Sequence, residues 1–183
     1  MIIGLIILAL IGGAVFWGIN VQRVLVKLDE MCKNAMSQIG VQLNSRWDAL
    51  TALADLTKGY SDHEYNALKD VISARTKITQ DSSVDQVNQQ EDAMSSVFGR
   101  LLAISEAYPD LKANQTYINT MNSVKEYEND VRMSRMVYND TVTKLNSMIR
   151  QFPASLIAER LGFSQREYLQ EPTGKTEMPS MVR

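Results

Sequence analysis

The sequence is poor in residues that crosslink a chain or bind metal ions. It contains one cysteine, Cys32, and one histidine, His63, among 183 residues. A single cysteine cannot form an internal disulfide, and the two side chains together are too few for a structural zinc site, which takes four nitrogen or sulfur ligands. The sequence therefore excludes disulfide scaffolds and zinc modules, and we expect neither a metal nor a cofactor.

The sequence also lacks an excess of basic residues. Lys and Arg number 19 against 21 Asp and Glu, which gives a formal net charge of -2. Domains that bind nucleic acid usually carry a strong excess of positive charge, because they neutralise phosphates. Nucleic acid is therefore not an expected partner.

No charged side chain precedes Arg23. The uncharged stretch before it includes residues 2–19 (IIGLIILALIGGAVFWGI), and a helix of about 20 residues crosses the hydrocarbon core of a bilayer. A cleaved signal peptide is the alternative, but such a peptide normally begins with a basic region and has a shorter apolar core. We predict a transmembrane anchor over residues 1–20, with the lipid bilayer as a partner.

Basic and aromatic residues define the end of this anchor. Arg23, Lys27 and Lys33 follow it closely, and no basic residue precedes it. Cytoplasmic flanks are enriched in Lys and Arg, and aromatic rings suit the headgroup region. We therefore predict that the N-terminus lies outside and the rest of the chain lies in the cytoplasm. The candidates for the membrane interface are Trp17, Arg23 and Lys27.

Small residues recur along the anchor at the spacing that allows membrane helices to approach closely. Ala9 is followed by Gly13 and Ala14 by Gly18, each pair four residues apart. These four residues are candidates for self-association within the membrane, although such spacings are common by chance in apolar segments.

Beyond the anchor, apolar residues recur in steps of three and four, which is the period of a helix with one buried face. The pattern predicts helices over 22–58, 61–80, 83–107 and 114–150, the first continuous with the anchor. No alternating apolar and polar run predicts a strand. We predict an all-α fold in which the anchor continues into an antiparallel up-down bundle of four main helices with a short C-terminal helical segment. The bundle would occupy residues 21–170, followed by a disordered tail over 171–183.

Three separated stretches resemble the LemA family. They begin at Asn34 (NAMSQIGVQLNSRWDALTALADLTKGYSDHEYNALKDVISAR), Arg100 (RLLAISEAYPDLKAN) and Tyr138 (YNDTVTKLNSMIRQFPASLIAERLGF). The resemblance implies a membrane-anchored antiparallel helical bundle with a short N-terminus outside, and one branch of the family is associated with magnetosome membranes. Thr51 stands where family members tend to carry a proline, so we expect a straighter first helix here.

Motifs of known enzymes are incomplete or missing. His63-Glu64 begins like the zinc-protease motif HExxH, but the second histidine position holds Ala67. The sequence contains neither a GxSxG nucleophile elbow nor a glycine-rich phosphate loop. We therefore expect that the protein is not an enzyme.

The predicted helices differ in length, and this difference predicts a seam. Helices over 22–58 and 114–150 would each be about 55 Å long, whereas the other two reach only about 30 and 37 Å. The short pair would pack at the far end, and the part near the membrane would be a stalk of two helices with an exposed apolar seam. The seam residues that are candidates for self-association are Leu25, Leu28, Leu145 and Ile149. The alternative is that residues 152–169 fold back over the seam and complete a monomer.

Two further interpretations concern packing near the seam. The stretch after Pro153 alternates apolar and basic residues, so it either joins the bundle core or lies on anionic lipid. Asn34, Asn139 and Asn146 lie next to the apolar stripes, where a buried amide can fix the register of packed helices.

The functional hypotheses follow from the anchor and the bundle. The first is a membrane-anchored structural or interaction protein that forms a homo-oligomer or a scaffold and organises or shapes the membrane. The alternative is a regulatory binding module for another membrane protein, such as a protease or a sensor.

Overall fold

The computed structural model describes residues 2–170, and the tail predicted over 171–183 lies outside the described residues. The described chain is helical and contains no strand, which confirms the all-α prediction. The helices are α1 (Ile2–Thr57), α2 (Asp62–Ser73), α3 (Val84–Ala107), α4 (Pro109–Lys112), α5 (Gln115–Arg150) and α6 (Ala154–Arg160).

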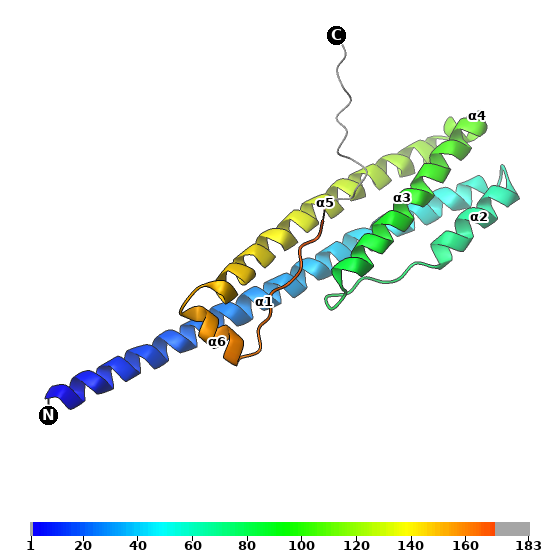
Figure 1. Cartoon of the computed structure of the whole chain (residues 1–183). Coiled ribbons are helices and arrows are strands. Elements are labelled where there is room, and N and C mark those ends of the chain that lie inside the picture. Colours follow the sequence, from blue (N-terminus) through cyan, green and yellow to red (C-terminus); the bar gives the residue numbers. More distant parts are fainter. Residues whose placement is uncertain (1, 171–183) are drawn as a thin grey trace, which may run out of the picture.

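Helix α1 runs without a break from the apolar N-terminal stretch into the bundle, as predicted (Figure 1). It continues through Thr51, whose hydroxyl donates to the Trp47 carbonyl oxygen one turn earlier at 2.8 Å. Helix α5 returns antiparallel to α1 along most of its length beyond the N-terminal stretch (Figure 1). These two helices are the longest of the described chain, and the shorter helices pack against them.

Polar side chains cap the start of α2, α3 and α5. Ser61 caps α2 by accepting from the Glu64 N–H, and Asn114 caps α5 by accepting from two backbone N–H groups. Ser83 and Gln86 form a complete capping box at the start of α3. Because these caps satisfy N–H groups that have no partner inside the helix, they fix where each helix begins.

The second helix is shorter than predicted. The prediction placed it over 61–80, a range that includes Ile78, but α2 ends at Ser73 and Ile78 lies in the following loop. Ile78 is nevertheless buried, because the loop passes directly over Gly40 of α1. A Cβ on Gly40 would lie 2.5 Å from the Ile78 carbonyl oxygen, so only glycine permits this approach. The helical spacing of apolar residues thus continues beyond Ser73 into the loop, although the helix itself ends there.

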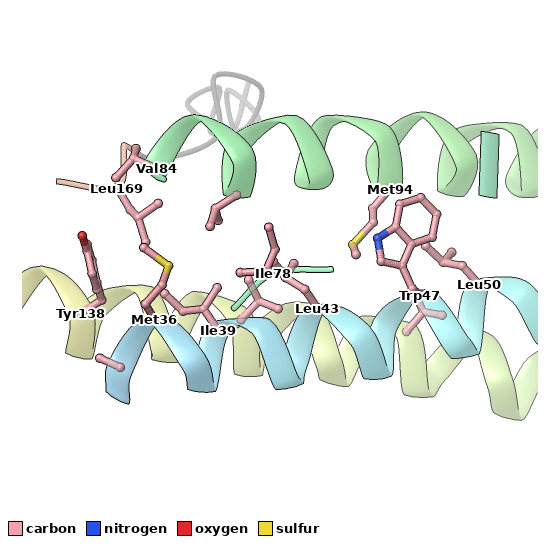
Figure 2. Packing of buried hydrophobic residues seen from close by; sticks show 14 of the residues in the cluster. Met36, Ile39, Leu43, Trp47, Leu50, Ile78, Val84, Met94, Tyr138 and Leu169 are labelled. Atoms are coloured by element: carbon pink, nitrogen blue, oxygen red, sulfur yellow. The ribbon is translucent and has the colours of Figure 1, made fainter. Parts of the chain in front are cut away.

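Two different covers lie over the pair of long helices. Helices α2 and α3 pack at the far end, as the length argument predicted, while α6 and the chain after it lie over the end near the N-terminus (Figure 1). Figure 2 shows Leu169, the last buried apolar residue of the described chain, pointing into the same core as Met36, Tyr138 and Val84. The core therefore continues from one cover to the other.

The predicted exposed seam is closed. Leu25 and Leu145 are fully buried within one chain, and Leu28 and Ile149 are partly buried against the same core. The expectation of an exposed stalk is therefore wrong for these residues, and the alternative, in which residues 152–169 fold back and complete the monomer, is the observed structure. The cover consists of α6 and the extended residues 163–169, and the extended part is bound mainly through its backbone, which leaves no periodic apolar signal in the sequence.

Candidate functional site

The N-terminal part of α1 projects beyond the bundle (Figure 1). It is long and apolar enough to cross a membrane, and the most apolar stretch of this helix has no buried residue. Among the small residues predicted to mediate self-association, Ala9, Gly13 and Ala14 are exposed, whereas Gly18 is half-buried. The interface candidates Trp17, Arg23 and Lys27 are all exposed.

Helix α6 divides its side chains between the core and solvent. Ala154 and Ala158 are buried and Ile157 packs partly against the core. On the outside, Leu156 is 61% exposed, and Phe152, which precedes the helix by two residues, is 81% exposed. The segment after Pro153 thus contributes to the bundle core through one face and leaves apolar side chains free on the other.

Residues 163–169, which we call the strap, run extended along the groove between α1 and α5 and are held by two asparagines of α5. The Asn146 amide donates to the Arg166 carbonyl oxygen and accepts from the Arg166 N–H, both at 2.9 Å. Asn139 makes the same pair of bonds with Leu169, again at 2.9 Å. Each asparagine therefore binds the strap backbone as a neighbouring strand would.

The spacing of the two asparagines explains why both can bind. Asn139 and Asn146 are separated by seven helical residues, which is about 10.5 Å along the axis of α5. Arg166 and Leu169 are separated by three extended residues, or about 10 Å. The distance between the two asparagines along the helix therefore matches the distance between their two partners along the antiparallel strap. The Tyr138 hydroxyl adds a bond of 3.2 Å to the Glu167 carbonyl oxygen.

An ion pair joins the strap to α1. Arg166 Nε and Nη2 donate to Asp29 Oδ1 at 3.1 and 2.7 Å, and Lys33 Nζ lies 3.2 Å from Asp29 Oδ2. Burial opposes ionisation of Asp29, but the bonds and charges of Arg166 and Lys33 outweigh it and hold the pKa of this carboxyl below its usual value. The strap is therefore tied to both long helices, by amides on one side and by a charge pair on the other.

The far part of the bundle contains a polar layer of a different kind. The Trp47 indole N–H donates to Gln90 Oε1 at 3.0 Å, and Arg135 of α5 pairs with Glu91 of α3. Arg46 Nη2 lies 3.3 Å from Glu128 Oε2, and burial lowers the pKa of the Arg46 guanidinium. All three contacts join different helices. They fix the register among α1, α3 and α5, since buried charges are costly unless paired.

Sequence reasoning found part of this arrangement. It placed Asn139 and Asn146 beside the apolar stripes as register residues, but their partner is the strap backbone, and Asn34 is exposed. The polar layer was missed, because Arg46 and Arg135 look like ordinary solvent-facing charges in sequence. The seven-residue spacing of the two asparagines is the one signal in the sequence that could have pointed to a common partner.

The described residues offer little reactive chemistry. No group of three His, Cys, Asp or Glu side chains in residues 2–170 is placed to hold a metal ion, and His63 is exposed. An open hollow of 440 Å³ lies where the loop before the strap meets the Asp29–Arg166 pair. Both of its charged groups already bind each other. The features that stand out are the apolar span, the exposed face of α6 and the strap.

Comparisons with known proteins agree with the resemblance found in the sequence. The pattern of the LemA family matches residues 35–182. Protein LemA of Metamycoplasma hominis is 28% identical over 131 residues, which is 70% of this chain and 59% of that protein. Magnetosome proteins MamQ 1 and MamQ 2 of Paramagnetospirillum magneticum are each 33% identical over 87 residues, or 47% of this chain. The chain matches about a third (32%) of the length of these magnetosome proteins.

Proposed function

This chain belongs to the LemA family, and from that premise we propose that it is a single-pass membrane protein that associates with further copies, so that the assembled bundles organise or shape the bilayer. The observation that carries the proposal is the continuity of α1 from the apolar span into the bundle core. Because no loop separates the two parts, the orientation of the bundle relative to its own membrane helix is fixed. A fixed orientation suits a scaffold.

The basic residues after the span support an orientation. Arg23, Lys27 and Lys33 would place the bundle in the cytoplasm and the N-terminus outside. Relatives named as magnetosome proteins support a location at a membrane. We propose the same membrane location for this chain and transfer no other property of those relatives to it.

Copies would meet through the membrane helix. Ala9, Gly13 and Ala14 are exposed, and a Cβ added at Gly13 would meet no other atom within 4 Å. Small residues allow a second membrane helix to approach closely. Leu25 and Leu145 are removed from this proposal because they are buried within one chain.

Disulfide crosslinking in native membranes tests the proposal. Cys32 is replaced by alanine, and a single cysteine is introduced at Gly13 or, as a matched control, at Val15, which is exposed on the side of the helix away from Gly13. We expect oxidation to produce dimers of Gly13→Cys and few or none of Val15→Cys. The apparent mass of the detergent-extracted chain should exceed that of a monomer.

Three results would count against it. Equal crosslinking at both positions indicates random collision, and a monomer without crosslinks removes self-association. A monomer that copurifies in stoichiometric amount with another membrane protein would support a regulatory binding module instead.

A further inference from the structure

We propose that the corner between α5 and α6 is a second membrane contact, in which Phe152 and Leu156 enter the interfacial region of the bilayer beside the α1 span. By the corner we mean residues 151–161. The inference rests on the proposed function in one respect, because it requires that α1 cross the membrane. It adds that the bundle also touches the lipid surface through a defined set of side chains.

A contact with α1 places the corner at the level of the membrane boundary. A Cβ at Gly18 would lie 3.6 Å from Ile157 Cδ1, so α6 packs directly on the end of the apolar span. The uncharged stretch ends shortly after Gly18, and a hydrocarbon core of about 30 Å that begins near Ile2 ends near Gln22. Helix α6 therefore lies where hydrocarbon gives way to headgroups.

The register of the long helices gives the same level independently. The ion pair between Arg46 and Glu128 aligns these residues across the antiparallel pair. Moving about 33 Å toward the N-terminus of α1, or 22 residues on each helix, reaches Val24 on α1 and Arg150 on α5. The turn after Arg150 is consequently level with Gln22.

The side chains of the corner suit an interface between lipid and water. Phe152 is among the most exposed large apolar residues of the described chain, and Leu156 and Leu161 are also exposed. Arg150 and Arg160 are exposed beside them, and Glu159 is the single acidic side chain of the corner. Apolar side chains with adjacent arginines are typical of segments that lie in the plane of an anionic membrane surface.

The contact would restrict how the bundle tilts. A single helix leaves a bundle free to tilt and to rotate about the membrane normal. Two contacts, the α1 span and the corner beside it, define a preferred tilt and select the side of α1 that meets lipid at the boundary. Helix α6 would also cover Gly18, which leaves Ala9, Gly13 and Ala14 for a neighbouring copy.

Depth measurements on the full-length protein test the inference. The chain carries Cys32→Ala and one fluorescent label on a cysteine at residue 152 or 156, in vesicles of phosphatidylcholine with a minority of phosphatidylglycerol. The matched control is Met136→Cys, which is similarly exposed but lies about 24 Å farther along α5. Leu10→Cys, in the middle of the span, is the reference for an inserted position. Each label is quenched by lipids that carry a nitroxide and by iodide in solution.

We expect lipid quenching at residues 152 and 156 to exceed that at residue 136 several-fold, with iodide showing the opposite order. Labels at 152 and 156 that behave like the label at 136, while Leu10→Cys is quenched by lipid, would overturn the corner contact and leave the membrane anchor intact. Labels shielded from both quenchers would also overturn it, because a second copy or another protein would then cover the corner. If Leu10→Cys is quenched only by iodide, both the anchor and the corner are wrong.

Discussion

The two ends of the α1–α5 pair close the same groove by different means. At the far end, α3 covers it with interdigitating side chains and with the polar layer that includes Trp47 and Gln90. At the near end, the strap covers it with its backbone, which Asn139 and Asn146 bind directly. A helix cover depends on side-chain volume, whereas the strap depends chiefly on hydrogen bonds. The near end should therefore open without unfolding the far end.

The largest effect on stability is expected from a substitution at the far end, where α3 covers the α1–α5 pair. Trp47→Ala removes a fully buried indole and leaves Gln90 without its bond, so we expect a loss of about 3–5 kcal/mol in the free energy of unfolding. Urea denaturation of the detergent-solubilised chain, followed by circular dichroism, measures this loss. Leu102→Ala, at an exposed position of α3, is the control and should cost well under that amount. A similar loss for both variants would contradict a side-chain core at this end.

An intermediate effect is expected from releasing the strap. Replacing both Asn139 and Asn146 by alanine removes four hydrogen bonds to the strap, which should favour local opening by about 2–4 kcal/mol. Opening should expose Cys32, which is buried beside Arg166, so alkylation of its thiol should accelerate by roughly two orders of magnitude.

The control for the strap is Asn122→Ala, which changes an exposed asparagine of the same helix. Hydrogen exchange should increase in residues 160–170 and remain slow in α3. If alkylation of Cys32 increases only in step with global unfolding, the two ends are not separable and the comparison fails.

The smallest effect concerns pH. Because the pKa of Asp29 is lower in the folded chain, its contribution is complete above the unfolded pKa of about 4 and is lost as pH falls through the folded value. Asp29→Asn should therefore be less stable than the parent by about 1 kcal/mol near neutral pH. Urea melts at several pH values measure the difference, which should shrink only below the unfolded pKa. A difference that stays constant down to the lowest pH would assign the effect to packing.

The same contrast explains what the sequence could predict. Helix α3 was placed correctly because its start is encoded locally, by Ser83 and Gln86, and its core face repeats every three to four residues. The strap was not placed, because its partners lie 20 and 30 residues away and bind backbone groups that any residue carries. Ile78 was assigned to a helix for a related reason, since burial in a loop and burial in a helix look alike in composition.

The residues proposed to contact the membrane could be predicted only where the local order of apolar and charged residues along the chain indicates them. Trp17, Arg23 and Lys27 are exposed on α1, and their place at a membrane interface stays a prediction. The level of α6 relative to Gly18 could not be predicted, because it depends on how far α5 descends and how the chain turns after Pro153.

Recognition of the strap through its backbone has a consequence for how this segment can evolve. Gln165, Glu167 and Tyr168 are exposed, and no side-chain hydrogen bond holds them to the long helices. Mutations at these positions can accumulate without loosening the strap, whereas each asparagine must keep an amide that both donates and accepts. The chain thus carries a segment whose sequence can drift while its path is preserved, provided that its length between the two amides does not change.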